Sequence, residues 1–310
     1  MRIIFFGTPD FAVPTLRALQ ESSEKVVTAV TQPDRVKGRG HKLSQPPVKE
    51  YALSKGIPVL QPSTIRSSEF FNTLCALRPD MIVVVAYGRV IPPQILSLPP
   101  QGCINVHASL LPKYRGAAPI QWAIVQGETE TGVTTMLMDE GLDTGDTLLM
   151  ETTEILPEDS ALTLGGRLSG MGARLLLETI GRIREGSVRP VPQSGEASYA
   201  PIIRKEHGRI DWNASAPDIH NLTRGMYPWP GAFCFFGREK VTLIKTVITE
   251  AAAKSAPGTI EMISANELRV STGEGSLSIV ELKPAGKPAM SGGAFARGRH
   301  IREGMRFEHQ

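Results

Sequence analysis

The chain has 310 residues, of which 41% are hydrophobic and 21% are charged, which is ordinary for a globular protein. This length allows two domains or one large one, with a full hydrophobic core. The three cysteines, Cys75, Cys103 and Cys234, are too far apart to indicate a disulfide framework or a zinc ligand set, and this usage fits a reducing compartment.

The net charge of +3 is unevenly distributed along the chain. Up to Ile203 there are 19 basic against 20 acidic residues, and from Arg204 onward there are 15 against 11. A positive final third is a weak indication of a polyanionic partner, and a solvated surface explains a modest excess equally well.

The first residues, MRIIFFGTPDF, run directly into a strand-like segment and lack the regions of a signal peptide. No apolar run in the sequence approaches the roughly 20 residues needed to cross a bilayer. We therefore expect a cytoplasmic protein without a membrane partner.

The first part of the chain alternates strand-like and helix-like segments. Apolar runs with strand character occur at 2–6, 26–31, 58–60, 81–86, 102–107 and 132–138. Apolar residues have helical spacing at 11–20, 51–55, 70–77, 119–126 and 162–185. This alternation predicts an α/β fold with a parallel sheet covered by helices on both faces, and such sheets bind ligands at the carboxyl ends of their strands.

The pattern changes after the last of these helices. Residues 186–201 are rich in Pro, Gly and Ser and have the composition of a linker. Short strand-like segments separated by turn signals then occur at 233–236, 241–247, 258–263, 267–271 and 276–282. They predict a small all-β unit, either a barrel or a sandwich.

The stretch 102–121, GCINVHASLLPKYRGAAPIQ, holds the first candidate site residues. Asn105 and His107 alternate along the predicted strand, so they share one face near its carboxyl end. An amide and an imidazole can both donate hydrogen bonds to a developing oxyanion, and an imidazole can also transfer a proton near neutral pH. From spacing alone, the two residues could equally satisfy buried backbone groups at a strand end.

The stretch 133–146, VTTMLMDEGLDTGD, ends an apolar strand in an acidic loop. Its acids are Asp139, Glu140, Asp143 and Asp146. One carboxylate close to His107 would hold the imidazole ring and favour its protonated form. Asp and Gly are also standard turn formers, so spacing does not choose among the four.

The stretch 32–43, QPDRVKGRGHKL, places four basic residues among glycines: Arg35, Lys37, Arg39 and Lys42. It could be a solvated surface loop or a basic arm that docks on nucleic-acid phosphates. Cofactor and metal motifs are absent from the sequence: GTPDF at 7–11 lacks the G-x-G-x-x-G fingerprint, and there is no phosphate-binding G-x-x-x-x-G-K-[ST] or metal-binding H-E-x-x-H.

The stretch HASLLPKYRGAAPIQWAI, with Asn105 before it and DEGLDTGD after it, is similar to the signature of the methionyl-tRNA formyltransferases. The resemblance covers nearly the whole chain and includes RIIFFGTPDFAVPTL, TQPDRVKGRGHKL, PDMIVVVAYGRVIP, GRIDW, YPWPGA and PAGKPAM. The SLLP segment and the Asn/His/Asp set are shared by the wider folate-dependent formyltransferase superfamily, so they indicate formyl transfer without defining the acceptor. The basic loop and the C-terminal segments are what resemble the tRNA enzymes. Lys113, Tyr114 and His207 depart from the commoner Arg, Trp and acid.

The resemblance implies a function and a set of site residues. The formyl group of the co-substrate 10-formyltetrahydrofolate would pass to the α-amine of methionyl initiator tRNA, without a metal, on a monomeric enzyme. Asn105, His107 and Asp143 match the catalytic positions of the family, which selects Asp143 among the four acids. The implied folate-binding residues are Ser109, Leu110, Leu111 and Pro112, with 87–91 and 139–143 as further pocket walls. The implied tRNA-binding residues are Arg35, Lys37, Arg39 and Lys42.

The resemblance also implies a Rossmann-like N-terminal catalytic domain at 1–185 with a mostly parallel sheet, a linker at 186–203, and an OB-like β-barrel at 204–310 that binds tRNA. Two other functions stay open at this point. A formyltransferase acting on a small amine would share residues 102–146 but would give no role to the basic loop. An RNA-binding module with a relic folate pocket would bind tRNA without turnover.

Overall fold

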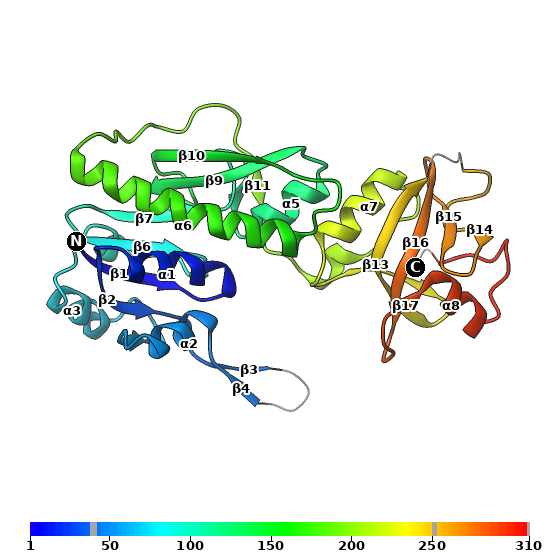
Figure 1. Cartoon of the computed structure of the whole chain (residues 1–310), viewed down its shortest axis with the longest axis horizontal. Coiled ribbons are helices and arrows are strands. Elements are labelled where there is room, and N and C mark those ends of the chain that lie inside the picture. Colours follow the sequence, from blue (N-terminus) through cyan, green and yellow to red (C-terminus); the bar gives the residue numbers. More distant parts are fainter. Residues whose placement is uncertain (38–41, 250–252, 309–310) are drawn as a thin grey trace. The chain divides into compact units, whose positions relative to one another are not determined.

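The computed structural model describes residues 1–37, 42–249 and 253–308. The chain divides into two compact units (Figure 1). The first comprises Met1–Pro119, Glu130–Glu154 and Gly165–Ala200. The second comprises Ile120–Thr129, Ile155–Leu164 and Pro201–Gln310.

The first unit contains a seven-stranded sheet of order β10-β9-β7-β6-β1-β2-β5. Its strands are β1 (Arg2–Gly7), β2 (Lys25–Val30), β5 (Val59–Leu60), β6 (Met81–Val85), β7 (Cys103–His107), β9 (Glu130–Leu137) and β10 (Thr147–Glu154). Five of them pair in parallel, whereas β9 is antiparallel to both β7 and β10. The expected α/β class with a mostly parallel sheet is confirmed. The edge strand β10 was not predicted, because TLLMETTE has no continuous apolar run and remains half exposed.

Helices cover both faces of this sheet, as the alternation of side chains along the strands requires. Ile4, Phe6 and Cys103 belong to a buried cluster that includes Phe70 of α3 (Ser68–Ala76) and Ile95 of α4 (Pro93–Leu96). The opposite face carries α6 (Ala161–Glu185), the long helix across the sheet in Figure 1. A Cβ on Gly172 of α6 would lie 2.7 Å from Val106 of β7, so this glycine allows the close approach of helix and sheet.

Shorter elements complete the first unit. They are η1 (Asp10–Ala12), α1 (Val13–Glu21), α2 (Pro47–Ser54), β8 (Arg115–Gly116), β11 (Tyr199–Ala200) and a hairpin of β3 (Arg35–Lys37) and β4 (Lys42–Ser44). Helix α5 (Pro119–Val125) begins in the first unit, but most of it belongs to the second. The hairpin was predicted only as a loop, because its strands are three residues long and rich in charge.

The second unit is built on antiparallel strands. Its sheet has the order β12-β13-β16-β15-β14, with β17 paired to β16. The elements are η2 (Lys205–Gly208), α7 (Ala216–Gly225), β12 (Ala232–Phe236), β13 (Glu239–Thr249), β14 (Ile260–Ile263), β15 (Leu268–Ser271), β16 (Ser276–Pro284), β17 (Met290–Ser291) and α8 (Gly292–Gly298). The expected C-terminal β unit is therefore present, but within the described ranges its paired strands do not form a closed barrel.

The core of the second unit forms around Trp212, which is fully buried and stacks on Phe307 with ring centroids 5.5 Å apart. His207, which departs from the acid that the resemblance leads one to expect, accepts a hydrogen bond at Nδ1 from the backbone N–H of Arg204, at 3.1 Å. A capping acid would accept the same bond, which explains why this departure is tolerated. None of the helices in the described part of the chain is both long enough and apolar enough for a membrane span.

Candidate active site

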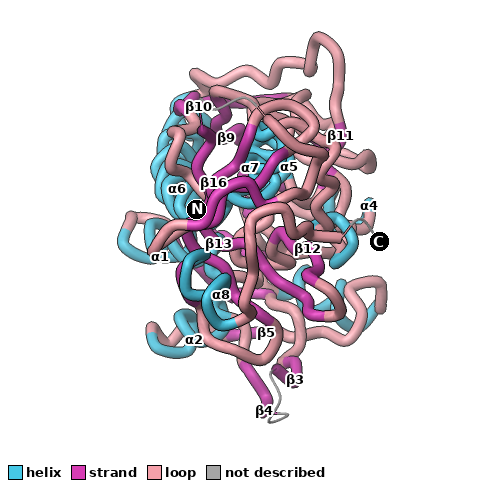
Figure 2. The backbone as a smooth tube through the Cα atoms, turned by 90° about the vertical axis from the view of Figure 1, so that its right-hand side faces the viewer, coloured by secondary structure: helices cyan, strands magenta, loops and turns pink. Residues whose placement is uncertain are grey.

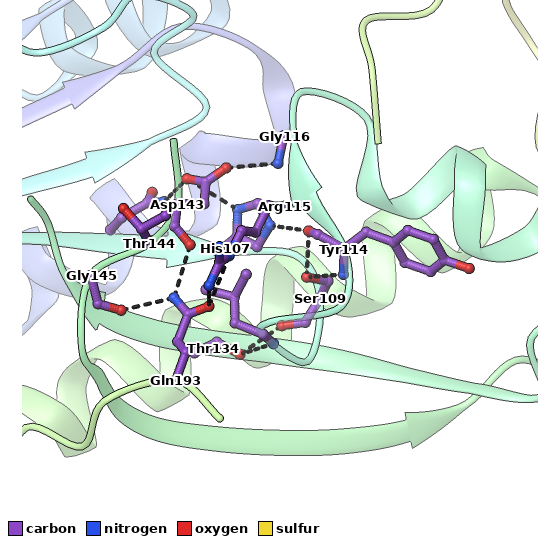
Figure 3. Close-up of polar contacts among 12 residues, drawn as sticks. His107, Ser109, Tyr114, Arg115, Gly116, Thr134, Asp143, Thr144, Gly145 and Gln193 are labelled. Atoms are coloured by element: carbon purple, nitrogen blue, oxygen red, sulfur yellow. Dashed lines mark hydrogen bonds and ion pairs between the residues drawn. The ribbon is translucent and has the colours of Figure 1, made fainter. Parts of the chain in front are cut away.

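Asn105 and His107 lie at the carboxyl end of β7, at the same end of the sheet as the carboxyl ends of the parallel strands β6 and β1. The two residues are 8% and 6% exposed, so both polar groups are held in a protected environment. Because alternate residues of a strand share a face, both side chains face the carboxylate of Asp143, and Figure 3 shows His107 beside it.

The imidazole of His107 is oriented through both ring nitrogens. Nε2 lies 2.7 Å from the carbonyl oxygen of Tyr114, and because a carbonyl only accepts, this nitrogen donates. Nδ1 lies 3.8 Å from Oδ1 of Asp143, an ion-pair distance. An imidazole with a proton on each nitrogen can direct an N–H toward both oxygens.

The carboxylate of Asp143 connects three elements of the site. Oδ1 accepts from Nδ2 of Asn105 at 3.4 Å, and Oδ2 accepts from the backbone N–H of Gly116 at 2.8 Å. Its side chain is 14% exposed, which leaves a limited route to solvent. Of the four acids left open by spacing, Asp143 is the one placed beside His107, whereas Asp139 closes its own turn by accepting from Thr144 Oγ1 at 2.7 Å.

The segment after β7 is tied down by hydroxyl groups. Ser109 Oγ donates to the carbonyl oxygen of Tyr114 at 2.9 Å and accepts from its N–H at 3.0 Å. Thr134 of β9 donates to the carbonyl oxygen of Ser109 at 2.6 Å and accepts from the N–H of Leu111 at 3.2 Å. Ser109 is 1% exposed, so its hydroxyl shapes this segment. Folate binding by Ser109, Leu110, Leu111 and Pro112 stays a prediction.

A pocket of about 490 Å³ opens beside the ends of β1, β2 and β6. It brings together Arg35, from the predicted tRNA-binding set, and Tyr87 and Gly88, from the predicted folate walls. Gln32 also lines it, and the side-chain oxygen of Gln32 is buried without a hydrogen-bond partner in the described part of the chain. Such an acceptor suits a ligand N–H. The remaining lining residues are Thr8, Pro9, Pro33, Val36, Ser44, Gln45, Pro46 and Ala86.

Arg35, Lys37 and Lys42 of the predicted tRNA-binding set lie on the β3–β4 hairpin. Arg35 is exposed, and the backbones of Lys37 and Lys42 pair with each other across the two strands. Arg39 and the side chains of Lys37 and Lys42 lie outside what the structure describes. With regard to metals, the residues at 1–37, 42–249 and 253–308 contain no group of three or more His, Cys, Asp or Glu that could hold an ion.

Three residues of this site gave no signal in the sequence. Thr134 reads as an ordinary strand residue, Gly116 acts through its backbone N–H, and Gln193 comes from the stretch predicted as a linker. Their roles depend on contacts between residues 23 to 78 positions apart in the chain, with Asp143 at 27 from Gly116 and 50 from Gln193. Local pattern does not reveal such contacts.

The chain matches known proteins over almost all of its length. Residues 1–180 match the family model described as formyl transferase, and residues 202–300 match the model of the formyl transferase C-terminal domain. The methionyl-tRNA formyltransferase of Thermodesulfovibrio yellowstonii is 52% identical over 98% of this chain and 97% of its own. That of Pelobacter propionicus is 50% identical over 97% and 94%.

Among solved structures, the N-formyltransferase of Helicobacter canadensis, in complex with folinic acid and dTDP-3-aminofucose, matches with a TM-score of 0.67. The match covers 91% of this chain and 99% of that one at 19% identity, a level that shows the shared fold alone.

The mixed α/β fold and the two family models define a formyl transferase. Two methionyl-tRNA formyltransferases share about half of their residues with this chain over nearly its full length. The chain therefore belongs to the methionyl-tRNA formyltransferase family. It is accordingly an enzyme that transfers a formyl group to methionyl-tRNA. The expectation drawn from the sequence motifs is confirmed at this level.

Proposed function

We propose that this enzyme takes its formyl group from 10-formyltetrahydrofolate and delivers it to the α-amine of methionyl initiator tRNA, using Asn105, His107 and Asp143. The observation that carries the proposal is the convergence of these three side chains at the carboxyl end of β7. The folate donor is supported by the family match and by the reduced-folate ligand named for a structural neighbour.

The acceptor amine needs little activation. An α-amine has a pKa of about 7.7–8.0, so a substantial fraction is neutral near pH 7, and esterification to tRNA lowers the value further. The neutral amine attacks the carbon of the formyl group that N10 of the folate carries. The carbonyl oxygen of this formyl group then becomes an oxyanion. Stabilising this oxyanion is the main task of the site.

Asn105 and His107 supply the hydrogen-bond donors for this oxyanion. The Asn105 amide and the His107 imidazole would donate to it from a site that is largely closed to water. His107 would donate from Nδ1, because Nε2 already donates to the Tyr114 carbonyl, whereas Nδ1 lies 3.8 Å from Asp143, beyond hydrogen-bond distance. Asp143 would orient the imidazole and help to carry the proton from the attacking amine to N10, the leaving nitrogen. Asn105 Nδ2 and His107 Nδ1 both face Oδ1 of Asp143, which supports their action as one unit.

The β3–β4 hairpin is proposed to receive the tRNA. Arg35, together with Lys37, Arg39 and Lys42, would contact phosphates of the acceptor stem. Arg35 also lines the pocket whose walls at Tyr87 and Gly88 are proposed for the folate, so the hairpin adjoins the proposed folate site.

We also infer that the C-terminal part forms an OB-like barrel. In this proposal the catalytic domain is 1–185, the linker is 186–203 and the barrel is 204–310. The support is the segment Gly304–Glu308, which hydrogen-bonds to both edges of the open sheet. Ile260 of β14 donates to the Met305 carbonyl at 2.8 Å, and Glu308 donates to the Phe235 carbonyl of β12 at 2.9 Å. A chain segment between two edge strands is how a barrel can close without direct pairing.

The test is single-turnover formylation of methionyl initiator tRNA with 10-formyltetrahydrofolate, run beside methionyl elongator tRNA and free methionine. The proposal expects rapid formylation of the initiator and poor use of the other two. Equal rates on all three acceptors would contradict the initiator assignment, and no formylation from this folate would contradict the donor.

A further inference from the structure

The segment 186–200 has the composition of a linker, and in Figure 2 it is drawn almost entirely as loop between α6 and β11. It is nevertheless fixed at two points of the first unit. Val191 and Thr147 of β10 exchange backbone hydrogen bonds of 2.8 and 2.9 Å. Further along, Tyr199–Ala200 pairs in parallel with Arg115–Gly116. Gln193 lies between these two anchors.

The side chain of Gln193 connects the two loops that hold the candidate catalytic groups (Figure 3). Its Nε2 donates to the carbonyl oxygens of Asp143 and Gly145, both at 2.8 Å. Its Oε1 accepts from Nε and Nη2 of Arg115, at 3.0 and 2.8 Å. Both amide protons and the amide oxygen are therefore engaged.

Asp143 needs such support because its backbone has φ of +52°, in the left-handed region. A residue other than glycine adopts this conformation at an energetic cost, so surrounding contacts must maintain it. Gln193 binds the backbone of Asp143, and the N–H of Gly116 binds its carboxylate. Asp143 is therefore held both at its backbone carbonyl and at its carboxylate.

We propose that Gln193 is a positioning residue for formyl transfer: it holds the loop of Asp143 against Arg115, so that the carboxylate stays beside His107 and Asn105. The residue type fits this task. An amide donates to two carbonyls and accepts from a guanidinium, whereas a carboxylate could only accept and an ammonium could only donate. This inference rests on the proposed role of Asp143.

Two variants separate the contacts of Gln193. Gln193→Glu keeps the acceptor for Arg115 but turns a carboxylate oxygen toward the carbonyls of Asp143 and Gly145. Gln193→Leu removes both sets of contacts. Ser194→Ala and Glu196→Gln are matched controls, because both side chains are exposed on the same segment.

The experiment measures kcat and both KM values by formylation of methionyl-tRNA, below the melting transition of each variant. A misplaced carboxylate should lower kcat by about 10- to 100-fold for Gln193→Glu and Gln193→Leu, with both KM values unchanged and the controls like wild type. A variant that raises either KM while keeping kcat would overturn the proposal. If Gln193→Leu does not fold, Gln193→Glu carries the test.

A double variant shows whether Gln193 acts through Asp143. Adding Gln193→Leu to Asp143→Asn should slow formylation no further, because the carboxylate that Gln193 positions is already gone. Multiplied losses would assign Gln193 an independent role and overturn the inference. Wild-type turnover of Asp143→Asn alone would instead contradict the proposed function, so the two failures are distinguishable.

Discussion

The carbonyl oxygen of Tyr114 lies 2.7 Å from Nε2 of His107, so the backbone at position 114 sets the orientation of the imidazole. The same carbonyl accepts from Ser109, which fixes its position. Because this contact is made by the backbone, it does not depend on which side chain residue 114 has. This explains how the chain can have Tyr114 where the family more often has Trp.

Removing either proposed oxyanion donor should slow the chemical step. We expect Asn105→Ala and His107→Ala each to lower kcat by about 10²- to 10³-fold, corresponding to about 2.7–4 kcal/mol, with little change in either KM. Single-turnover formylation with both substrates saturating measures this directly. Glu196→Gln, at an exposed acid outside the proposed site, is the control and should remain near wild type. Near-wild-type turnover of either Ala variant would remove that residue from the mechanism.

The basic hairpin should act on tRNA alone. Arg35→Ala and Arg39→Ala are each expected to raise the KM for tRNA and to reduce the slope of log affinity against log salt by about 1, because each removes one phosphate contact. The KM for folate should not change. Lys25, exposed at the start of β2 and so at the other end of this strand from the hairpin, provides the control variant Lys25→Ala. An unaltered salt slope would show that these arginines do not bind phosphate.

The base of the hairpin is held by Lys49 of α2. Its Nζ lies 2.8 Å from Asp34, directly before β3, and 2.7 Å from Gln61. The hydrogen bond from Lys49 is the main cause that lowers the pKa of Asp34. Lys49→Met should therefore loosen the hairpin and raise the KM for tRNA by roughly three- to tenfold while kcat stays the same. Lys55→Met, exposed at the end of the same helix, should have no effect, and equal effects of both would refute this anchor.

Gly116 should tolerate no side chain. Its φ is +114°, and an added Cβ would lie 2.6 Å from the carbonyl oxygen of Ala200. Gly116→Ala should therefore lower the melting temperature and also kcat, because its N–H holds Asp143. Gly186→Ala, at φ +66° with open space around it, isolates the backbone cost of about 1–2 kcal/mol. A Gly116→Ala variant no less stable than Gly186→Ala would contradict the clash.

The elements that sequence predicted correctly have a strong local signal. MIVVV of β6 is a continuous apolar run, and Asn105 and His107 alternate on a recognisable strand. By contrast, β10 is half exposed, and β3 and β4 have only three residues each, so neither periodicity nor length marks them. Pattern also did not reveal that β9 runs antiparallel, because orientation is fixed by pairing across the sheet.

The candidate site likewise contains residues that have a local sequence signal and residues that have none. Asn105 and His107 could be found from strand alternation, whereas selecting Asp143 among four acids required either the family resemblance or the geometry. Gln193 was out of reach, because its stretch has the composition of a linker and its partners are 48 to 78 residues away in sequence. Composition describes a segment in isolation and carries no information about what it packs against.

The second unit should lose stability in mild acid through His220 of α7, whose Nδ1 lies 2.9 Å from Thr246 Oγ1. Burial is the main cause that lowers the pKa of His220 below its ordinary value of 6.5; Arg224 lowers it further, while Glu158 and the contact with Thr246 oppose the shift. As the pH falls below about 6.5, the unfolded chain therefore protonates before the folded one. The unfolding free energy should therefore decrease as the pH falls from about 6.5, and the decrease should end once the pH is below the lower pKa that His220 has in the folded protein.

Tryptophan fluorescence can follow this loss, because Trp122, Trp212 and Trp229 all belong to the second unit. The thermal midpoint of wild type should fall more between pH 7.5 and pH 5.5 than that of His220→Asn, which has no group to protonate there. His300→Gln, at an exposed histidine, should behave like wild type. If His220→Asn lost as much stability as wild type over this range, the titration of His220 would not be its cause, and the acid sensitivity would have to come from the carboxylates of the unit.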